Sequence, residues 1–403
     1  MSIPESGSDY TYIRKAFGPA LAFLLPWMNV FLPTSDSLTA LAFGQYAVQP
    51  FFPNSAAPKT AIKLIATCML LLVAVINAVS VKWAVRVQSV ITSAKFLTIA
   101  FVVAGGVYFC IHDPSVAETT FANLFSWKQI GGIHFSTISN AVYQVMWTYQ
   151  GWNALCYVTE EVDHPRTVAV ASVIAVVVVA ISFITINISY LLVLTPLEMS
   201  SSQTVALTFA NKLLGNGAWA VSVMVCIVTF GSYNCSVMMS ARTLFVAARN
   251  GHIPQIFGML HIHRTTPLTA LILNALPTVV LVWIGDIETL LSTFGFVSWT
   301  FATFSSASVL VLRIKLPDLP RPYKVPTIIP IFMTAISFFF VVLPLIGNLH
   351  FLYLYAVGFF AAGFVVYFIF VRRKARLPGI DPTTSCLQKL FAIAPEDSDH
   401  NDS

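Results

Sequence analysis

The stretch at residues 143–167 (YQVMWTYQGWNALCYVTEEVDHPRT) holds the groups best suited to bind a small polar ligand. It begins as an apolar helix and is interrupted at 148–153 by a glycine and a cluster of hydrogen-bonding side chains. A helix that breaks at membrane depth exposes backbone donors and acceptors that lipid cannot satisfy, so such a break persists only where it lines a cavity or a ligand. The pattern predicts the discontinuous helix of a secondary transporter. A tolerated glycine in an ordinary span is the alternative.

Two further residues, Asp36 and Lys95, carry charged side chains inside apolar stretches. A charge in mid-span costs about 2.5–3.5 kcal/mol on insertion scales, so we expect Asp36 to face the protein interior or to be protonated. Lys95 lies about two turns into its span, where it either snorkels toward the interface or holds a functional charge. Both residues are therefore candidates for transport coupling.

The composition places these residues in a polytopic membrane protein. The 403 residues are 57% hydrophobic and only 10% charged, whereas a soluble domain carries about 25% charge. The first apolar run is too long for the core of a cleavable signal peptide. The net charge of +5 does not indicate nucleic-acid binding, because here the positions of the basic residues matter more than their sum. The sequence contains no HExxH motif, no GxSxG motif and no pair of acidic residues within one span. It therefore gives no indication of an intramembrane enzyme.

Ten apolar stretches are long enough, at roughly 20 residues each, to cross a bilayer as helices. They lie at residues 17–49, 60–80, 87–111, 137–159, 168–195, 216–240, 267–285, 288–312, 326–347 and 350–371. Seventeen Lys and Arg residues fall in one set of loops and tails, against four in the other set. The positive-inside rule then predicts a cytoplasmic segment at 1–16, a transmembrane domain at 17–371 and a cytoplasmic tail at 372–403.

Cysteine and histidine patterns indicate neither a disulfide scaffold nor a metal site. Five of the six cysteines fall in or at the ends of apolar spans and the sixth lies in the tail, so a disulfide framework is not expected. Three histidines, His252, His261 and His263, lie in one basic connection without a nearby cysteine or carboxylate partner. We expect a solvated loop there, and we expect no metal and no cofactor.

Several blocks of the chain resemble one family of transporters. GWNALCYVTEEVDHPRT, at residues 151–167, looks like the sixth-helix signature of the L-type amino-acid transporter family, which comprises light subunits of heterodimeric transporters in the APC superfamily. The blocks SGSDYTYIRKAFGP, NAVSVKWAVRVQ, SARTLFVAARNGHIP and RPYKVP stand in the family's order. The resemblance implies an all-α, LeuT-type fold of two inverted repeats of five helices plus two more. In the family the first of these blocks follows the second transmembrane helix, which implies a chain truncated by two helices.

The resemblance also implies a function and a set of site residues. The function is sodium-independent exchange of zwitterionic, large neutral amino acids across the plasma membrane. A truncated isoform that does not transport, or a subunit of such a transporter, is the rival interpretation. Lys95 approaches the place where sodium-coupled relatives bind a cation, whereas the family usually has an uncharged residue at Asp36. The implied substrate contacts are Trp147, Tyr149, Gln150, Gly151, Asn153, Asn234, Ser236, Phe296 and Trp299.

Three of these positions carry more specific expectations. The family uses the position of Trp147 as a gate over the ligand, and we expect Phe301 to lie off the substrate face. Gln150 is neutral where a family member for basic substrates has an aspartate, which argues against dibasic substrates, although Asp36 argues for them. Ser55 replaces the cysteine that bridges the family's light subunits to a glycoprotein heavy chain. A heavy-chain partner is therefore implied without a disulfide bond through this position.

Overall fold

The computed structural model describes residues 7–53, 55–123, 135–151, 154–157, 165–319, 321, 325–347, 351–373 and 380–395. In this part of the chain seven helices are long and apolar enough to cross a membrane. They are α4 (Lys59–Val79), α5 (Val81–His112), α9 (Pro165–Val193), α12 (Trp219–Arg249), α14 (Ile287–Lys315), α15 (Ile328–Gly347), and α16 (Phe351–Val366) with the π-helical turn η6 (Tyr367–Val371).

The remaining apolar helices complete the expected series of spans. The helix α13 (Leu268–Ile284) is shorter, and α8 (Phe135–Thr148) ends where the sequence predicts an interruption, before the short helix η2 (Ala154–Tyr157). The first expected span consists of α2 (Pro19–Phe31) and α3 (Thr34–Val48). Each of the ten expected ranges therefore holds a helix or an interrupted helix, as an APC-type polytopic membrane protein requires.

The first span differs from the continuous helix that its apolar composition predicts, because it breaks at Leu32 and Pro33. Leu32 leaves the helical region, with φ −132° and ψ 60°, and the Thr34 N–H bonds to the carbonyl oxygen of Leu32 at 2.7 Å. Proline has no N–H and disfavours the helical conformation of the residue before it. The chain thus contains a second helix interruption besides the predicted one at the end of α8.

Two glycines set the distances between helices that position the site. A Cβ atom on Gly295 of α14 would lie 2.2 Å from the ring of Tyr143 on α8, and one on Gly231 of α12 would lie 2.3 Å from Ile91 on α5. Only glycine permits these approaches, which bring α8 against α14 and α5 against α12. Small residues serve the same purpose in many membrane helix pairs. The largest buried apolar cluster lies among α3, α4, α12, α13 and α14.

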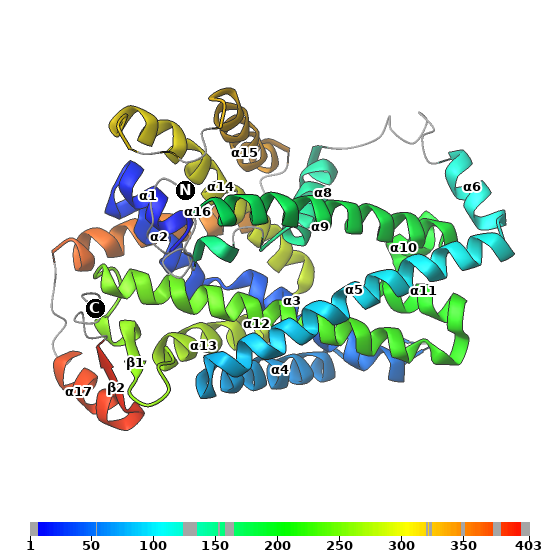
Figure 1. The fold of residues 1–403 in the computed structure, drawn as a ribbon, viewed down its shortest axis with the longest axis horizontal. Helices are drawn as coiled ribbons and strands as arrows, with labels where there is room; N and C mark the ends of the chain where they lie inside the picture. The colour runs from blue at the N-terminus through cyan, green and yellow to red at the C-terminus, as the bar shows by residue number, and fades with distance from the viewer. Residues whose placement is uncertain are drawn as a thin grey trace.

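Short elements lie at the two ends of the long helices (Figure 1). One end carries α1 (Asp9–Phe17), η5 (Gln255–Gly258), α17 (Ile380–Phe391) and the antiparallel strands β1 (Met259–His261) and β2 (Ile393–Pro395). The opposite end carries α6 (Ser115–Asn123), α10 (Pro196–Ser201) and α11 (Val205–Leu214). Two 3-10 turns, η1 (Gln49–Phe51) and η4 (Gly215–Gly217), follow α3 and α11. Both described ends of the chain, α1 and β2, therefore lie on the same side of the bundle.

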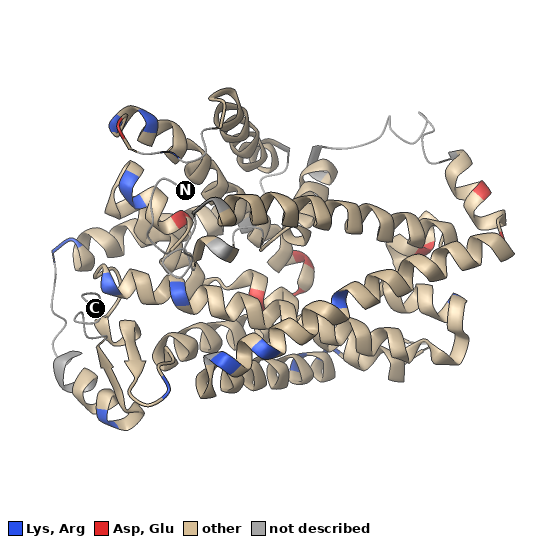
Figure 2. Cartoon of the chain, viewed as in Figure 1, with Lys and Arg blue, Asp and Glu red and all other residues tan. Residues whose placement is uncertain are grey.

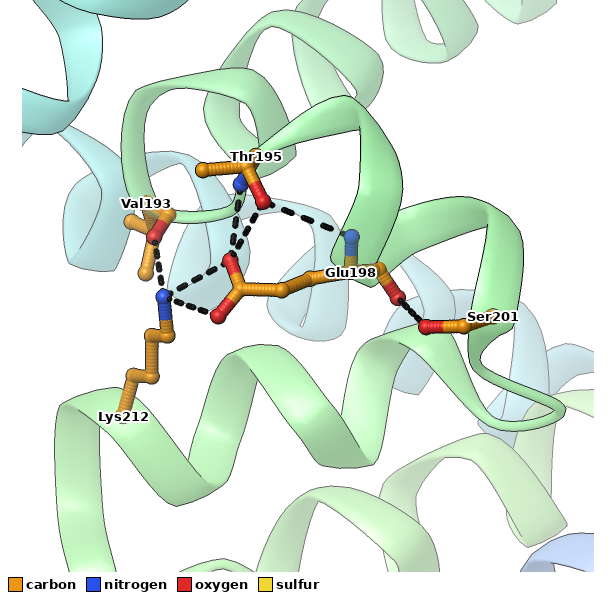
Figure 3. Close-up of polar contacts among 5 residues, drawn as sticks. All are labelled: Val193, Thr195, Glu198, Ser201 and Lys212. Atoms are coloured by element: carbon orange, nitrogen blue, oxygen red, sulfur yellow. Dashed lines mark hydrogen bonds and ion pairs between the residues drawn. The ribbon is translucent and has the colours of Figure 1, made fainter.

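The connection between α9 and α11 is tied by a polar cluster (Figure 3). The Thr195 side chain accepts a hydrogen bond from the Glu198 N–H at 3.4 Å, and the Thr195 N–H donates to the Glu198 carboxylate at 2.8 Å, which together form a capping box. Lys212 donates to the same carboxylate at 2.8 Å. This hydrogen bond from Lys212 is the main reason that the pKa of Glu198 lies below its usual value. The segment between α9 and α11 is thus an ordered helical cap.

Charged residues are sparse along the long helices. In Figure 2, the Lys and Arg residues are concentrated toward the side of the molecule that holds α1 and β2. This distribution agrees with the asymmetry counted in the sequence, and it leaves Lys95 and Asp36 as charges within the helical bundle.

Candidate functional site

The two helix interruptions meet at a cavity of about 600 Å³. Its walls come from the α2–α3 junction, the end of α8, the middle of α12, α14 and α15. The volume lies within the range of about 300–1,000 Å³ that small-molecule sites usually have. The residues considered below that line it are Asp9, Leu32, Pro33, Thr34, Ser35, Asp36, Met146, Tyr149, Gln150, Ser236, Trp299, Phe301, Ser305, Met333 and Ser337.

Asp36 is the central charged group of the cavity wall. Its side chain is 3% exposed, and the hydroxyl of Ser236 donates a short hydrogen bond to its Oδ1 atom. The side-chain amide of Asn274 donates to Oδ2 at 3.2 Å. A carboxylate at membrane depth requires such partners, because hydrocarbon offers none. Asp36 therefore faces the protein interior, one of the two alternatives left open for it above.

Residues from both interruptions line the same cavity. Ser35 donates through its hydroxyl to the Gln150 side-chain oxygen at 2.5 Å, which joins the start of α3 to the end of α8. The first turn of a helix has N–H groups without intrahelical acceptors, and the last turn has carbonyl groups without intrahelical donors. Beyond Gln150, Gly151 has φ +100°, a conformation that glycine adopts readily and that ends the helix. The cavity therefore combines partial positive charge from one helix end with partial negative charge from another.

Two polar atoms that line the cavity have no hydrogen-bond partner among the described residues. These are the indole nitrogen Nε1 of Trp299 and the hydroxyl oxygen of Ser337, both buried. An unpaired buried polar atom costs roughly 1–3 kcal/mol. Such atoms persist where a ligand or water satisfies them. Both atoms belong to the wall of the cavity that α14 and α15 form.

The structure brings five of the predicted substrate-binding and coupling residues to this cavity. They are Asp36, Tyr149, Gln150, Ser236 and Trp299. Gly151 follows directly on Gln150 at the end of α8, and Asn153 lies outside the described residues.

The other expected site residues lie in separate surroundings. Asn234 is fully buried and accepts a hydrogen bond from Asn77 at 2.8 Å, while its own amide donates to Gln88 at 3.2 Å. Phe296 packs against Tyr143 and Tyr353 in an aromatic cluster. Neither Asn234 nor Phe296 is a lining residue of the cavity described above.

Trp147 and Phe301 are placed differently from the sequence-based expectation. Trp147 packs against the large apolar cluster formed by α3, α4 and their neighbours, and it is not a lining residue of the cavity. Phe301, expected to lie off the substrate face, lines the cavity wall. For Phe301, the difference arises from the rotation of α14 about its own axis, which turns this side chain toward the cavity. Apolar composition alone does not determine that rotation.

Lys95 does not line the cavity but approaches it through α12. Its ammonium group donates to the hydroxyl of Ser232 at 3.1 Å, on the same helix as Ser236. The bond ties the Lys95 ammonium to α12, which argues against simple snorkelling to the interface.

Sequence reasoning missed several polar residues of the cavity, among them Ser337 and Asp9. Ser337 is one of two hydroxyl residues in the otherwise apolar α15, and the other, Thr334, bonds to a carbonyl of its own helix at 2.7 Å. Asp9 lines the cavity from α1 and accepts a hydrogen bond from Ser305 at 2.6 Å. An isolated hydroxyl in an apolar helix is a signal that could have found Ser337. Nothing local distinguishes Asp9 from an ordinary charge in a terminal segment.

The chemistry of the cavity suits binding and not catalysis. Its charged lining residues among those described are the carboxylates Asp9 and Asp36, and the rest are hydroxyl, amide, aromatic and apolar groups. In the described part of the chain no three His, Cys, Asp or Glu side chains gather where they could hold a metal ion. The arrangement can bind an ammonium group, a carboxylate and an apolar side chain through separate partners.

Comparison with known proteins gives consistent matches along the chain. A family model for amino acid permeases matches residues 1–371. The b(0,+)-type amino acid transporter 1 of Mus musculus is 34% identical over 404 residues, which cover 98% of this chain and 81% of that protein. The cystine/glutamate transporter of Homo sapiens is 34% identical over 405 residues, covering 98% of this chain and 79% of that protein. The large neutral amino acids transporter small subunit 2 of Mus musculus is 36% identical over 341 residues, covering 82% and 62%.

Proposed function

The chain belongs to the amino acid permease family as a multi-pass membrane transporter, not an enzyme, and we propose that it exchanges large neutral amino acids without sodium. The observation that carries the proposal is the cavity in which Asp36, the start of α3 and the end of α8 converge. The names of its relatives span b(0,+)-type, cystine/glutamate and large neutral amino-acid transport. The substrate class proposed here therefore rests on the cavity and the family resemblance.

The polar ends of the substrate have separate partners in this proposal. The substrate carboxylate binds at the first turn of α3, where the N–H groups and the helix dipole favour an anion. The ammonium group binds to the Asp36 carboxylate and to carbonyl groups at the end of α8. Gln150, held by Ser35 at 2.5 Å, fixes the two helix ends relative to each other. In this proposal the start of α3 stabilises the negative charge of the substrate, and the end of α8 stabilises its positive charge.

The apolar side chain of the substrate lies against α14 and α15. Trp299, Phe301 and Met333 supply an aromatic and thioether surface at that side of the cavity, and Met146 of α8 adds a second thioether. Methionine adapts to ligands of different shape, which suits a site that accepts several large neutral side chains. The unpaired indole N–H of Trp299 and hydroxyl of Ser337 bond to a polar atom of the substrate or to water bound with it.

Lys95 supplies a fixed positive charge in place of a bound cation. Its bond to Ser232 holds the ammonium against α12, one helical turn from the serine that contacts Asp36. A permanent charge at this place removes the need for a sodium gradient. Transport is then exchange, driven by the substrate gradients themselves.

The protein acts in the plasma membrane with both termini in the cytoplasm. The charge distribution supports this orientation, because basic residues are retained on the cytoplasmic side. A heavy-chain glycoprotein associates with the chain, as the small-subunit relative suggests. Ser55 at the family's cysteine position makes this association non-covalent.

Uptake into proteoliposomes tests the proposal. The purified protein, alone and with a heavy-chain glycoprotein, is assayed with a panel of labelled amino acids, with and without sodium. We expect uptake of large neutral amino acids that does not need sodium and that increases when the vesicles are preloaded with substrate. Uptake that requires sodium, or that is confined to dibasic or acidic substrates, would contradict the proposal.

The variant Asp36→Asn tests the site itself, with Asp113→Asn as its control. Removing a charge-assisted hydrogen bond of about 1.5–3 kcal/mol should raise KM roughly 10- to 100-fold. Asp113 is exposed at the end of α5 and does not line the cavity, so its variant should behave as the parent protein. Equal kinetics for the two variants would show that Asp36 does not bind substrate.

A further inference from the structure

A second cavity lies between α3 and α12, apart from the substrate site. This groove, with a volume of about 560 Å³, is formed by the end of α3, η1, part of α12 and Ile91 of α5, and we call it the α3–α12 groove. It shares no lining residue with the substrate cavity. Several of its residues are exposed, including Phe51 at 80% and Trp219 at 62%. The groove is therefore open to the surroundings of the helical bundle and separate from the substrate cavity.

Ser222 is the residue of the groove whose side chain needs a hydrogen-bond partner. Its side chain is 2% exposed, and its hydroxyl finds no hydrogen-bond partner among the described residues. The surrounding groups are almost entirely apolar, so the lone hydroxyl carries a desolvation cost of roughly 1–3 kcal/mol. A lipid tail cannot relieve that cost, because it has no hydrogen-bonding group. The occupant must therefore carry a polar atom that reaches Ser222.

The lining residues also restrict the charge of the occupant. The described residues of the groove include no Lys, Arg, His, Asp or Glu. Its polar groups are hydroxyls and a thiol, and the Tyr46 hydroxyl already accepts a hydrogen bond from the Ala206 N–H at 3.4 Å. A phosphate or carboxylate headgroup would find no counter-charge there, and leaving a charge unpaired in such surroundings is costly. The occupant is therefore uncharged.

The shape of the groove separates its polar end from its apolar end. Trp219 and Pro50 stand at the rim, where they also line a neighbouring cavity rich in hydroxyl and amide side chains. The groove runs along α12 from Trp219 to Phe230, a distance of about 16 Å at 1.5 Å per residue. Ser222 lies one helical turn from the rim, and Phe43, Ile91 and Phe230 enclose the inner part. A hydroxyl near the rim and an apolar body directed inward fit this arrangement.

We propose that the α3–α12 groove binds a membrane sterol, with the sterol hydroxyl hydrogen-bonded to Ser222 and the fused rings packed against Phe43, Trp219 and Phe230. A sterol carries one uncharged hydroxyl at the end of a rigid apolar body. Its rings lose little conformational freedom on binding, whereas each ordered acyl chain loses many rotamers. Flat ring systems also suit a wall of aromatic side chains. Bound between α3 and α12, the sterol bridges two helices that also form the substrate site.

Photolabelling of the full-length protein in phosphatidylcholine nanodiscs tests the proposal. The probe is a photoreactive cholesterol analogue, and the competitors are cholesterol and its 3α-hydroxyl epimer, which differs only in the direction of the hydroxyl. We expect saturable labelling of peptides from α3 and α12. The epimer should compete more weakly than cholesterol, and Ser222→Ala should weaken labelling roughly two- to tenfold, as the loss of one neutral hydrogen bond implies.

Two tryptophan variants supply a matched comparison. Val223→Trp fills the groove and should reduce labelling at least tenfold by exclusion, whereas Ile174→Trp adds the same ring to the exposed face of α9 and should leave it unchanged. Non-saturable labelling, equal competition by the two epimers, or equal labelling of the two tryptophan variants would overturn the proposal. Equal competition by phosphatidylcholine would show that the groove holds only bulk lipid. If Val223→Trp does not fold, the epimer and Ser222→Ala comparisons decide the question on folded protein.

Discussion

Lys95 and Asp36 hydrogen-bond to hydroxyl groups that lie one helical turn apart on α12. The Lys95 ammonium donates to Ser232, and Ser236 donates to the Asp36 carboxylate. A separation of four residues along a helix is about 6 Å. The opposite charges of α5 and α3 are thus held against one side of a third helix. A movement of the Lys95 side chain would therefore act on Asp36, at the substrate cavity, through α12.

Lys95→Ala should impair transport while leaving the amount of protein at the cell surface largely intact. The proposed role of the ammonium is to replace a bound cation, so its loss should lower the maximal rate of exchange at least tenfold. Lys63→Ala is the control, because Lys63 is also on a transmembrane helix but donates to the Trp283 carbonyl near the bundle's edge. Uptake kinetics unchanged by Lys95→Ala would rule out this role.

Trp299→Phe should raise KM roughly two- to tenfold without lowering the thermal midpoint of unfolding. The change keeps the aromatic surface but removes the indole N–H, which has no partner among the described residues. If the N–H serves only the fold, removing an unpaired buried donor should stabilise the protein and leave KM unchanged. Substrate titrations and thermal melts on the same preparation distinguish the two outcomes.

Comparing Trp147→Ala with Phe301→Ala tests the gate that the family resemblance implies. The gate predicts the larger loss of affinity and turnover for Trp147, whereas the cavity wall includes Phe301 and not Trp147. Since Trp147 is partly buried against the apolar core, its variant should also lower the free energy of unfolding, by less than the roughly 3–5 kcal/mol that truncation of a fully buried tryptophan costs. A kinetic defect confined to Phe301→Ala would assign the substrate contact to α14.

Ser55→Cys should create a covalent complex with a heavy-chain glycoprotein where the parent protein has none. Ser55 is exposed in the connection after η1, and its carbonyl accepts a hydrogen bond from Gln49 at 2.9 Å. Within the described part of the chain, none of the six native cysteines forms a disulfide bond. Non-reducing electrophoresis of the co-expressed proteins is the measurement. A high-mass band of the parent protein that collapses on reduction would show that another cysteine serves this purpose.

The protein should lose stability as the pH falls below about 6.5, through His252. His252 is buried between α12 and η5, and its Nδ1 lies 3.0 Å from the Tyr10 hydroxyl. Burial, with a smaller effect of the Arg14 charge, lowers the pKa of His252 to about 4. The rings of Phe23 and Tyr367 pack against its remaining sides. The folded protein therefore keeps His252 neutral at a pH where the unfolded chain binds a proton.

The sign and the size of this effect follow from proton linkage. Between pH 6.5 and about 4 the unfolded state binds more protons, so the free energy of unfolding falls by up to about 1.4 kcal/mol per pH unit. Thermal midpoints at pH 7.5 and 5.5 should differ less for His252→Gln than for the parent protein. His263→Gln, in the exposed connection, should keep the full difference. Equal pH dependence in all three proteins would contradict the assignment to His252.

Features that depend on neighbouring residues in the chain could be predicted from the sequence. The ten spans follow from runs of apolar residues, and the end of α8 near Thr148 follows from the cluster of polar residues and glycine after it. The inward orientation of Asp36 follows from the cost of a charge in hydrocarbon. These features are local, because backbone hydrogen bonding and transfer from water to lipid act on each segment separately.

Only the tertiary structure decided which residues share one cavity. The break at Leu32 and Pro33 faces the break after Thr148, and Phe301 and Ser337 line the site, whereas Asn234 bonds to Asn77 elsewhere. Each of these placements depends on the rotation of a helix about its own axis. In a soluble helix an apolar stripe reveals that rotation. In a membrane helix the lipid-facing side and the packed side are both apolar, so only contacts between helices set the rotation.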